Sequence, residues 1–270
     1  NGSRAPIPDR ANQRSSCTAA IAAPTMPASF PNAAGTISAR LLSSGPKCCQ
    51  FSVTPPPITN TSGATTLSTA GTITGRTESA VVGGAQISLI GDRGVGTSLD
   101  ALQIDQTNVA NASLTVTSAS GLVNLRETVG DLRVNSITAG AGTSVTLDVD
   151  GALSVASGSV AAANIAGGSL TVTAGGDIGS VAVPLRINSG STNSDKVNIT
   201  SGGSVFINEI AGNLLIDQLQ AVGDVSIRIT SGSLLDGNDF IERDDRKYNE
   251  LVNGVWKDLA LTNTDGAATA

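Results

Sequence analysis

Histidine is absent from the 270 residues, and aromatic residues make up only 2% of them. The three cysteines, Cys17, Cys48 and Cys49, lie in the first fifth of the chain and form no C-x-x-C pair. These absences argue against a zinc site and exclude a histidine-dependent nucleophilic triad. The sequence contains no run of about 18 apolar residues, so it predicts no membrane-spanning helix. The net charge of −6 argues against nucleic acid as a partner, because phosphate binding needs clustered Lys and Arg.

An internal repeat is the main feature that the sequence does have. Residues 87–155 and 170–235 carry short aliphatic triplets in matching order, separated by turns rich in Gly, Ser and Asn. The last apolar residues of six successive pieces match at one near-constant offset: Ile104 with Ile187, Val116 with Ile199, Leu125 with Ile207, Val134 with Ile216, Leu147 with Ile227 and Val155 with Leu235. A period of roughly 82 residues that returns so regularly indicates a stacked repeat architecture.

The triplets alternate between aliphatic and polar residues, as in Leu185-Arg186-Ile187. Alternation with period two predicts strands with one buried and one solvated face. Short, evenly spaced strands fit either an antiparallel sandwich or a parallel β-helix. Asn-Gly hairpin signals are scarce, and each strand position recurs with the same residue type, which favours the β-helix. The fold prediction is therefore all-β: a right-handed parallel β-helix with coils of roughly 20 residues and about four coils in each copy.

The flanks of the repeat differ from it. Residues 1–60 hold nine of the ten prolines and predict a disordered or irregular leader, or irregular coils that cap the array. The β-helix is expected over 61–238. Asp239, three residues before Glu242, resembles a capping box, and the apolar residues that follow predict a helix from about 239 to 252 within a helical insertion over 239–262. Residues 263–270 form a tail, and the chain is expected to be a fragment of a longer polypeptide.

Several segments resemble the large, repetitive filamentous-haemagglutinin-like exoproteins of bacteria: GDIG at 176–179, PLRI at 184–187, VNITSGGSVFINE at 197–209, LLID at 214–217 and GSLLDGNDF at 232–240. The first copy departs from this pattern, with GDRG at 91–94, and the leader does not match. The resemblance implies a secreted, cell-surface β-helical adhesin or stalk that binds a cell-surface or matrix ligand, such as a glycan. It also implies that further repeats of the same longer chain stack on this segment. It carries over no catalytic residue and no cofactor.

Four acidic residues recur at matched places: Asp92 with Asp177, and Glu127 with Glu209. They are weak candidates for calcium ligands. The alternative is that each carboxylate caps backbone N–H groups in a turn. The G-G-x-G-x-D calcium pattern of β-helices is absent.

Two functions remain open on the sequence. The first is a structural shaft segment of a secreted surface fibre, acting in attachment or display. The second is a carbohydrate-active or carbohydrate-binding β-helix. Enzymes of that kind use convergent carboxylates, usually with aromatic residues that stack sugars. Asp148 and Asp150 share a strand face without a partner, and Phe206, the only aromatic residue between Ser52 and Asp239, sits in an inward-alternating stretch. We therefore expect no enzymatic activity.

Overall fold

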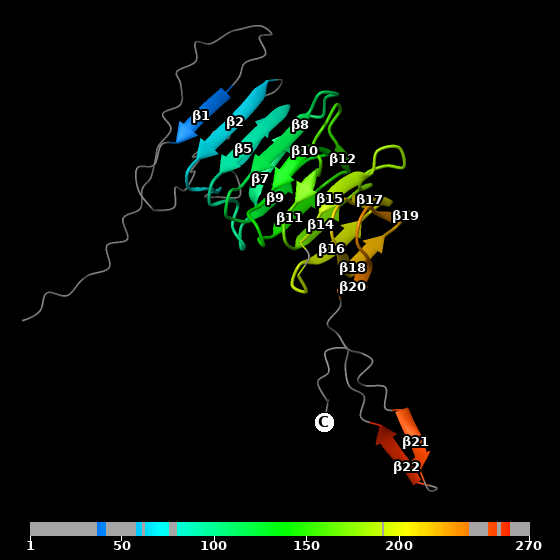
Figure 1. The fold of residues 1–270 in the computed structure, drawn as a ribbon. Helices are drawn as coiled ribbons and strands as arrows, with labels where there is room; N and C mark the ends of the chain where they lie inside the picture. The colour runs from blue at the N-terminus through cyan, green and yellow to red at the C-terminus, as the bar shows by residue number, and fades with distance from the viewer. Residues whose placement is uncertain are drawn as a thin grey trace, which may run out of the picture.

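The computed structural model describes residues 37–41, 58–60, 63–75, 80–190, 192–237, 248–252 and 255–259. Its main body is two ten-stranded sheets that the chain enters alternately, and all the strand pairings within these sheets are parallel in the described part. The strands of successive coils lie side by side along the stack (Figure 1). This arrangement is a parallel β-solenoid, which confirms the predicted all-β fold class.

Sheet 1 is built from strands that each pair with a strand one coil away. Its members are β1 (Ile37–Leu41), β2 (Ala64–Thr69), β5 (Gln86–Gly91), β8 (Ser113–Thr117), β10 (Leu132–Thr138), β12 (Leu153–Val155), β13 (Ile165–Ala166), β15 (Leu185–Asn188), β17 (Val205–Glu209) and β19 (Val225–Ile229).

Sheet 2 has the same construction. Its members are β3 (Thr72–Ile73), β4 (Val81–Gly84), β6 (Gly94–Val95), β7 (Leu102–Gln106), β9 (Val123–Glu127), β11 (Val145–Val149), β14 (Leu170–Ala174), β16 (Lys196–Ser201), β18 (Leu214–Ala221) and β20 (Leu234–Asp236).

The core is made of aliphatic columns that run across the coils. The period-two pattern turns every second side chain inward, and parallel register places it on the equivalent side chain of the next coil. One column in sheet 2 joins Leu125, Leu147, Val172, Ile199 and Leu219. The first four of these are buried and Leu219 is partly buried against the core. Each coil therefore covers the apolar side chains of its neighbours, as stacked repeats require.

Coil length is not constant. Val205 pairs with Val225 across a short coil, whereas Ile137 pairs with Ile165 across a longer one. The longer coil arises because β12 and β13 both pair with β10 and residues 156–164 lie between them. The predicted length of roughly 20 residues thus describes only the shorter coils.

The sequence repeat does not return each strand to its own position in the solenoid. Ile104 lies in β7 of sheet 2, but its match Ile187 lies in β15 of sheet 1. The other five matched pairs also fall in opposite sheets. Since β12 and β13 occupy one sheet position together, the offset spans seven half-turns, or three and a half coils. The repeat thus spans slightly fewer coils than the expected number of about four. The expectation that each strand position recurs was wrong, because both sheets face one core and accept the same aliphatic pattern.

The predicted C-terminal helix is also wrong where the chain is described. Tyr248–Val252 (β21) and Val255–Leu259 (β22) pair antiparallel, with Val252 opposite Val255. The sequence between them, Asn253-Gly254, is a strong signal for a two-residue hairpin loop. This signal outweighs the helical spacing of the apolar residues around it. Residues 239–247 and 263–270 lie outside the described residues.

Regular structure begins before residue 61. Strand β1 lies within the segment predicted as a disordered or irregular leader, and it pairs in parallel with β2. Ile58 forms a bridge to Val82 and accepts a hydrogen bond from the backbone N–H of Gly83 at 2.7 Å. The rest of the leader, including its three cysteines, lies outside the described residues. Within the described part, the structure contains no helix long and apolar enough to cross a membrane.

Candidate functional site

Two loops leave sheet 1 at neighbouring coils. Residues 156–164 separate β12 from β13, and residues 180–184 separate the bridge residue Ile178 from β15. Ile178 bridges both Leu153 in the coil before and Val205 in the coil after. The two loops therefore interrupt sheet 1 in adjacent coils, whereas β10 before them and β17 after them each run through the sheet as one strand.

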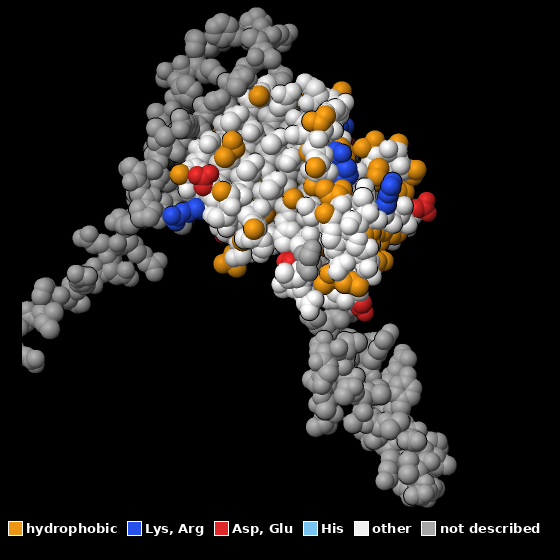
Figure 2. Space-filling view, in the orientation of Figure 1, with side chains coloured by type: hydrophobic (Ala, Val, Ile, Leu, Met, Phe, Trp, Pro, Cys, Tyr) orange, Lys and Arg blue, Asp and Glu red, His pale blue; other side chains and the backbone are white. Residues whose placement is uncertain are grey.

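A cleft of about 490 Å³ lies between these loops on the outer side of sheet 1. This volume is within the range of small-molecule sites, about 300–1,000 Å³. Arg186 is the only ionisable residue in its lining, which otherwise combines small apolar residues, two serines and one amide. The lining is Val155, Ala156, Ser157, Gly158, Ser159, Ala182, Val183, Pro184, Arg186 and Asn208. Figure 2 shows Lys and Arg side chains among hydrophobic ones over the region of β12, β15, β17 and β19.

Arg186 is held by the buried side chain of Asn164. The Asn164 Oδ1 atom accepts from the backbone N–H of Arg186 at 3.1 Å and from its Nε at 3.4 Å. The Asn164 Nδ2 atom donates to the backbone oxygen of Asn135 at 3.1 Å and to Ser159 Oγ at 3.4 Å. One buried amide thus joins the 156–164 loop to the base of the arginine. The Asn164 amide oxygen contacts only Nε of the Arg186 guanidinium, so the two terminal nitrogens remain available as donors.

Asn208 follows Arg186 in the same outward row, one coil later. The surroundings of its amide identify the nitrogen as the atom that faces the backbone oxygens of Arg228 and Glu209, each at 3.3 Å, and Thr230 Oγ1 at 3.0 Å. Arg228, the next residue in the row, is exposed. Two arginines therefore stand two coils apart, about 10 Å along the stack, with an amide between them.

Apolar side chains are exposed on both loops. Val160 is 94% exposed on the first loop, and Val181 and Val183 are 81% and 51% exposed on the second. Single exposed apolar residues are common. Of these three valines, Val183 lines the cleft, so the cleft presents one cation beside an exposed apolar side chain.

Phe206 was expected to sit in an inward-alternating stretch, and the structure corrects this. Its neighbours Val205 and Ile207 are buried, whereas Phe206 is only partly buried and belongs to the outward set of β17.

Gly179 lies very close to the backbone of Phe206. Its φ is +68°, and an added Cβ would contact the carbonyl oxygen of Phe206. This positive φ lets the chain turn out into the 180–184 loop, and only glycine adopts it without strain.

The matched glutamates are buried links between coils. Glu127 ends β9, and both of its carboxylate oxygens lie 3.1 Å from the backbone N–H of Gln106 in the coil before. Glu209 ends β17 and accepts from the N–H of Ser189 at 3.1 Å and from its hydroxyl at 2.8 Å. These contacts fit the backbone-capping interpretation: the carboxylates satisfy N–H groups where the chain leaves a strand.

Burial shifts the pKa of both glutamates upward. Desolvation raises the pKa of Glu127 to about 8, a shift that the nearby charge of Asp105 assists and the N–H of Gln106 opposes. Desolvation also raises the pKa of Glu209, while its hydrogen bonds to Ser189 lower it. A carboxyl such as that of Glu127, which holds its proton near neutral pH, is a poor ligand for a cation.

The two aspartate candidates are exposed in turns. Asp177 Oδ1 accepts from the N–H of Ser204 at 2.6 Å, while the backbone oxygen of Asp92 accepts from Ser120. All four acidic candidates belong to different coils. No group of three or more His, Cys, Asp or Glu side chains suited to a metal ion occurs in the described part of the chain.

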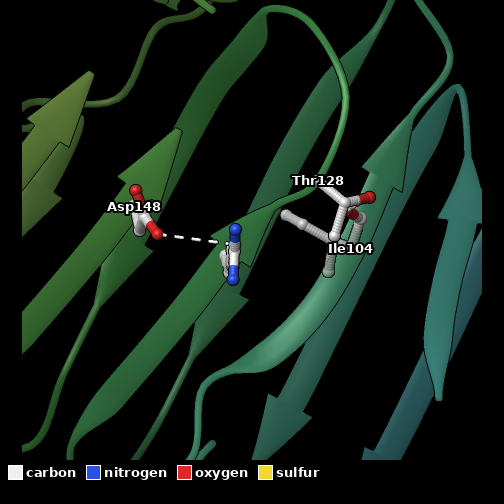
Figure 3. Close-up of polar contacts among 4 residues, drawn as sticks. Ile104, Thr128 and Asp148 are labelled. Carbon is white, nitrogen blue, oxygen red and sulfur yellow. Dashed lines mark hydrogen bonds and ion pairs between the residues drawn. The ribbon is translucent and has the colours of Figure 1, made fainter. Parts of the chain in front are cut away.

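Asp148 and Asp150 each have a partner of their own in the preceding coil. Asp148 is paired with Arg126 of the preceding coil at 3.4 Å on the outer face of sheet 2, with side chains 53% and 58% exposed (Figure 3). Asp150 Oδ2 accepts from the N–H of Gly130 at 3.3 Å in the adjoining turn. In the same view, Thr128 Oγ1 donates to the carbonyl of Ile104 at 3.2 Å, another link between coils.

Sequence reasoning missed Arg186 and Asn164. The one available signal was that Arg186 is the polar member of an alternating triplet and must therefore point outward. That Asn164 lies beneath it follows from the register of two strands in neighbouring coils, which no local pattern reveals. The described residues form a parallel β-solenoid, and the cleft at Arg186 is a candidate small-molecule site within them. The chain matches no family model, no curated protein and no solved structure.

Proposed function

We propose that this chain is a structural shaft segment of a secreted, cell-surface adhesin or filamentous exoprotein of the filamentous-haemagglutinin-like kind, acting in attachment or display and without catalytic activity. The observation that supports the proposal is the continuous core, in which buried aliphatic residues follow one another from Leu67 to Leu214 without a break. From β2 to β19, sheet 1 advances seven coil steps, about 34 Å. We also propose that the solenoid winds right-handed, the common hand of parallel crossovers.

The shaft proposal is tested by whether an intact solenoid is needed for reach. The chain is anchored at one end to a bacterial surface under a polysaccharide coat and carries an epitope tag at the other end. Antibody binding to the tag is expected to fall when Ile199→Asp disrupts the core and to persist when the neighbouring, partly exposed position is changed by Thr200→Asp. Equal tag access in both variants would reject the shaft role.

A carbohydrate-binding solenoid is the second candidate, and the cleft between the two loops of sheet 1 favours it. Its lining offers hydroxyl, amide and guanidinium groups for sugar hydroxyls, beside apolar surface. Binding of the full chain to a glycan array would support this candidate. Release of new reducing ends from a polysaccharide would instead overturn the proposal that the chain is not an enzyme.

A further inference from the structure

We propose that the cleft between the 156–164 and 180–184 loops binds an acidic sugar, with Arg186 holding the carboxylate and Val183 contacting an acyl group of the ligand. An acidic-sugar site goes beyond the shaft role and rests on the carbohydrate-binding candidate, because it names the chemical class that the same cleft would take.

The charge of the cleft favours an anion. Arg186 is its only ionisable lining residue, and the carboxylate of the neighbouring Glu209 lies on the core side, bound to Ser189. The rest of the lining supplies no carboxylate to neutralise the guanidinium. Asn164 contacts the Nε edge, and this contact leaves the terminal nitrogens as a planar pair of donors. Such a fork matches the two oxygens of a carboxylate and supports bidentate recognition.

The contact with Asn164 holds the guanidinium of Arg186 in place before a ligand binds. Asn164 is fully buried and has polar partners for both amide atoms, on the 156–164 loop side and on β15. Fixing one edge of a guanidinium reduces the rotamer entropy that ligand binding would otherwise cost. We therefore assign Asn164 as a positioning residue and Arg186 as the ligand-binding residue.

The surroundings favour a sugar over a peptide. An extended peptide commonly adds as a strand to an open sheet edge. The cleft lies on the face of sheet 1 beside β15 and β17, which are both paired with neighbouring coils, so it offers no open edge. What it offers instead are the side chains of Ser157 and Asn208, together with the exposed apolar side chain of Val183; the Ser159 hydroxyl already donates to the backbone oxygen of Asn135 at 3.2 Å. A ligand with a carboxylate, several hydroxyls and an acyl group fits this set.

The test measures binding of N-acetylneuraminate to the full chain by NMR titration. The neutral N-acetylmannosamine and the peptide-like carboxylate N-acetylvaline serve as comparison probes. We expect binding of the acidic sugar, weakened about tenfold or more by Arg186→Gln and less so by Arg186→Lys, which keeps the charge but not the fork. Arg228→Gln, in the same row but outside the cleft lining, is the matched control and should change affinity by less than about twofold.

A second pair of variants guards against misfolding. Val183 is half exposed, so Val183→Glu and Val183→Gln should both fold, and only the glutamate should abolish binding of the acidic sugar. If the neutral sugar binds as well as the acidic one, the carboxylate inference fails and the carbohydrate-binding candidate stands. If neither sugar binds, both fail while the shaft proposal is untouched. Arg186-dependent binding of N-acetylvaline alone would show a peptide carboxylate site and overturn the sugar assignment.

Discussion

Replacing Glu127 by glutamine should remove a large part of the pH dependence of stability. Burial raises the pKa of this carboxyl from 4.5 to about 8, so the folded state holds the proton more tightly than the unfolded state does. A raised carboxyl pKa means that ionisation opposes folding. Glu127 therefore lowers the stability of the protein as the pH rises from about 4.5, and this loss is complete once the pH passes about 8.

The size of the effect follows from the shift. Each pKa unit corresponds to 1.36 kcal/mol, so a shift of about 3.5 units gives a loss of at most about 5 kcal/mol between these limits. Glu127→Gln keeps an acceptor for the N–H of Gln106 and carries no charge at any pH. At pH 4.5 the variant and the parent should have similar stability, whereas at pH 8 the variant should be more stable by several kcal/mol.

Urea denaturation followed by circular dichroism at pH 4.5, 6 and 8 measures the difference. Asp148→Asn, which removes an exposed carboxylate on the same sheet, is the matched control for the loss of one negative charge. Glu209→Gln should reduce the pH slope in the same direction as Glu127→Gln, because desolvation also raises the pKa of Glu209. If the stability of Glu127→Gln falls in parallel with that of the parent from pH 4.5 to 8, then Glu127 is ionised in the folded protein and the reasoning is refuted.

Three further outcomes test the packing. Ile199→Asp places an unpaired charge in a core column and should cost more than about 4 kcal/mol, seen as loss of a cooperative circular-dichroism melt, whereas Thr200→Asp should cost less than about 1 kcal/mol. Gly121→Ala should lower the free energy of unfolding by about 1–3 kcal/mol, because its Cβ would contact the carbonyl of Arg93 in the preceding coil. The change is measured as a lower urea midpoint, and an unchanged midpoint would show that the coils can separate there. Asp148→Asn should change the free energy of unfolding by less than about 1 kcal/mol at constant pH, since its ion pair is exposed; a larger loss would show that this pair is part of a stabilising network.

The core could be predicted from local pattern because burial in a strand depends on alternation. Alternation predicts that Leu185 and Ile187, the outer residues of the triplet Leu185-Arg186-Ile187, point inward, and both are buried. The last coil shows the limit of that reasoning. Leu235 matches Val155 in sequence, yet it is 40% exposed because no described coil stacks beyond β20. Burial there depends on a neighbour, which the pattern of one strand does not contain.

The C-terminal segment was misread for a related reason. Apolar residues in a short stretch can satisfy a helical spacing and a strand pairing at once, and the Asn253-Gly254 dipeptide is the signal that separates the two. Of the candidate site, the sequence pattern indicates only that Arg186 points outward. Asn164 and Arg186 meet only because the register of β13 with β15 brings them to adjacent coils.

Period-two alternation and glycine-rich turns act within a few residues of chain, so they specify short strands with an aliphatic inner face before any long-range contact forms. The sheet that each strand joins depends on long-range pairing between coils. Both sheets bury the same aliphatic pattern in one core, and coil length varies with the loops, so the offset of the sequence repeat can span three and a half coils. The same variation places two loops side by side and builds the cleft at Arg186. Glu127 and Glu209, which match in sequence, are both buried but end strands of opposite sheets.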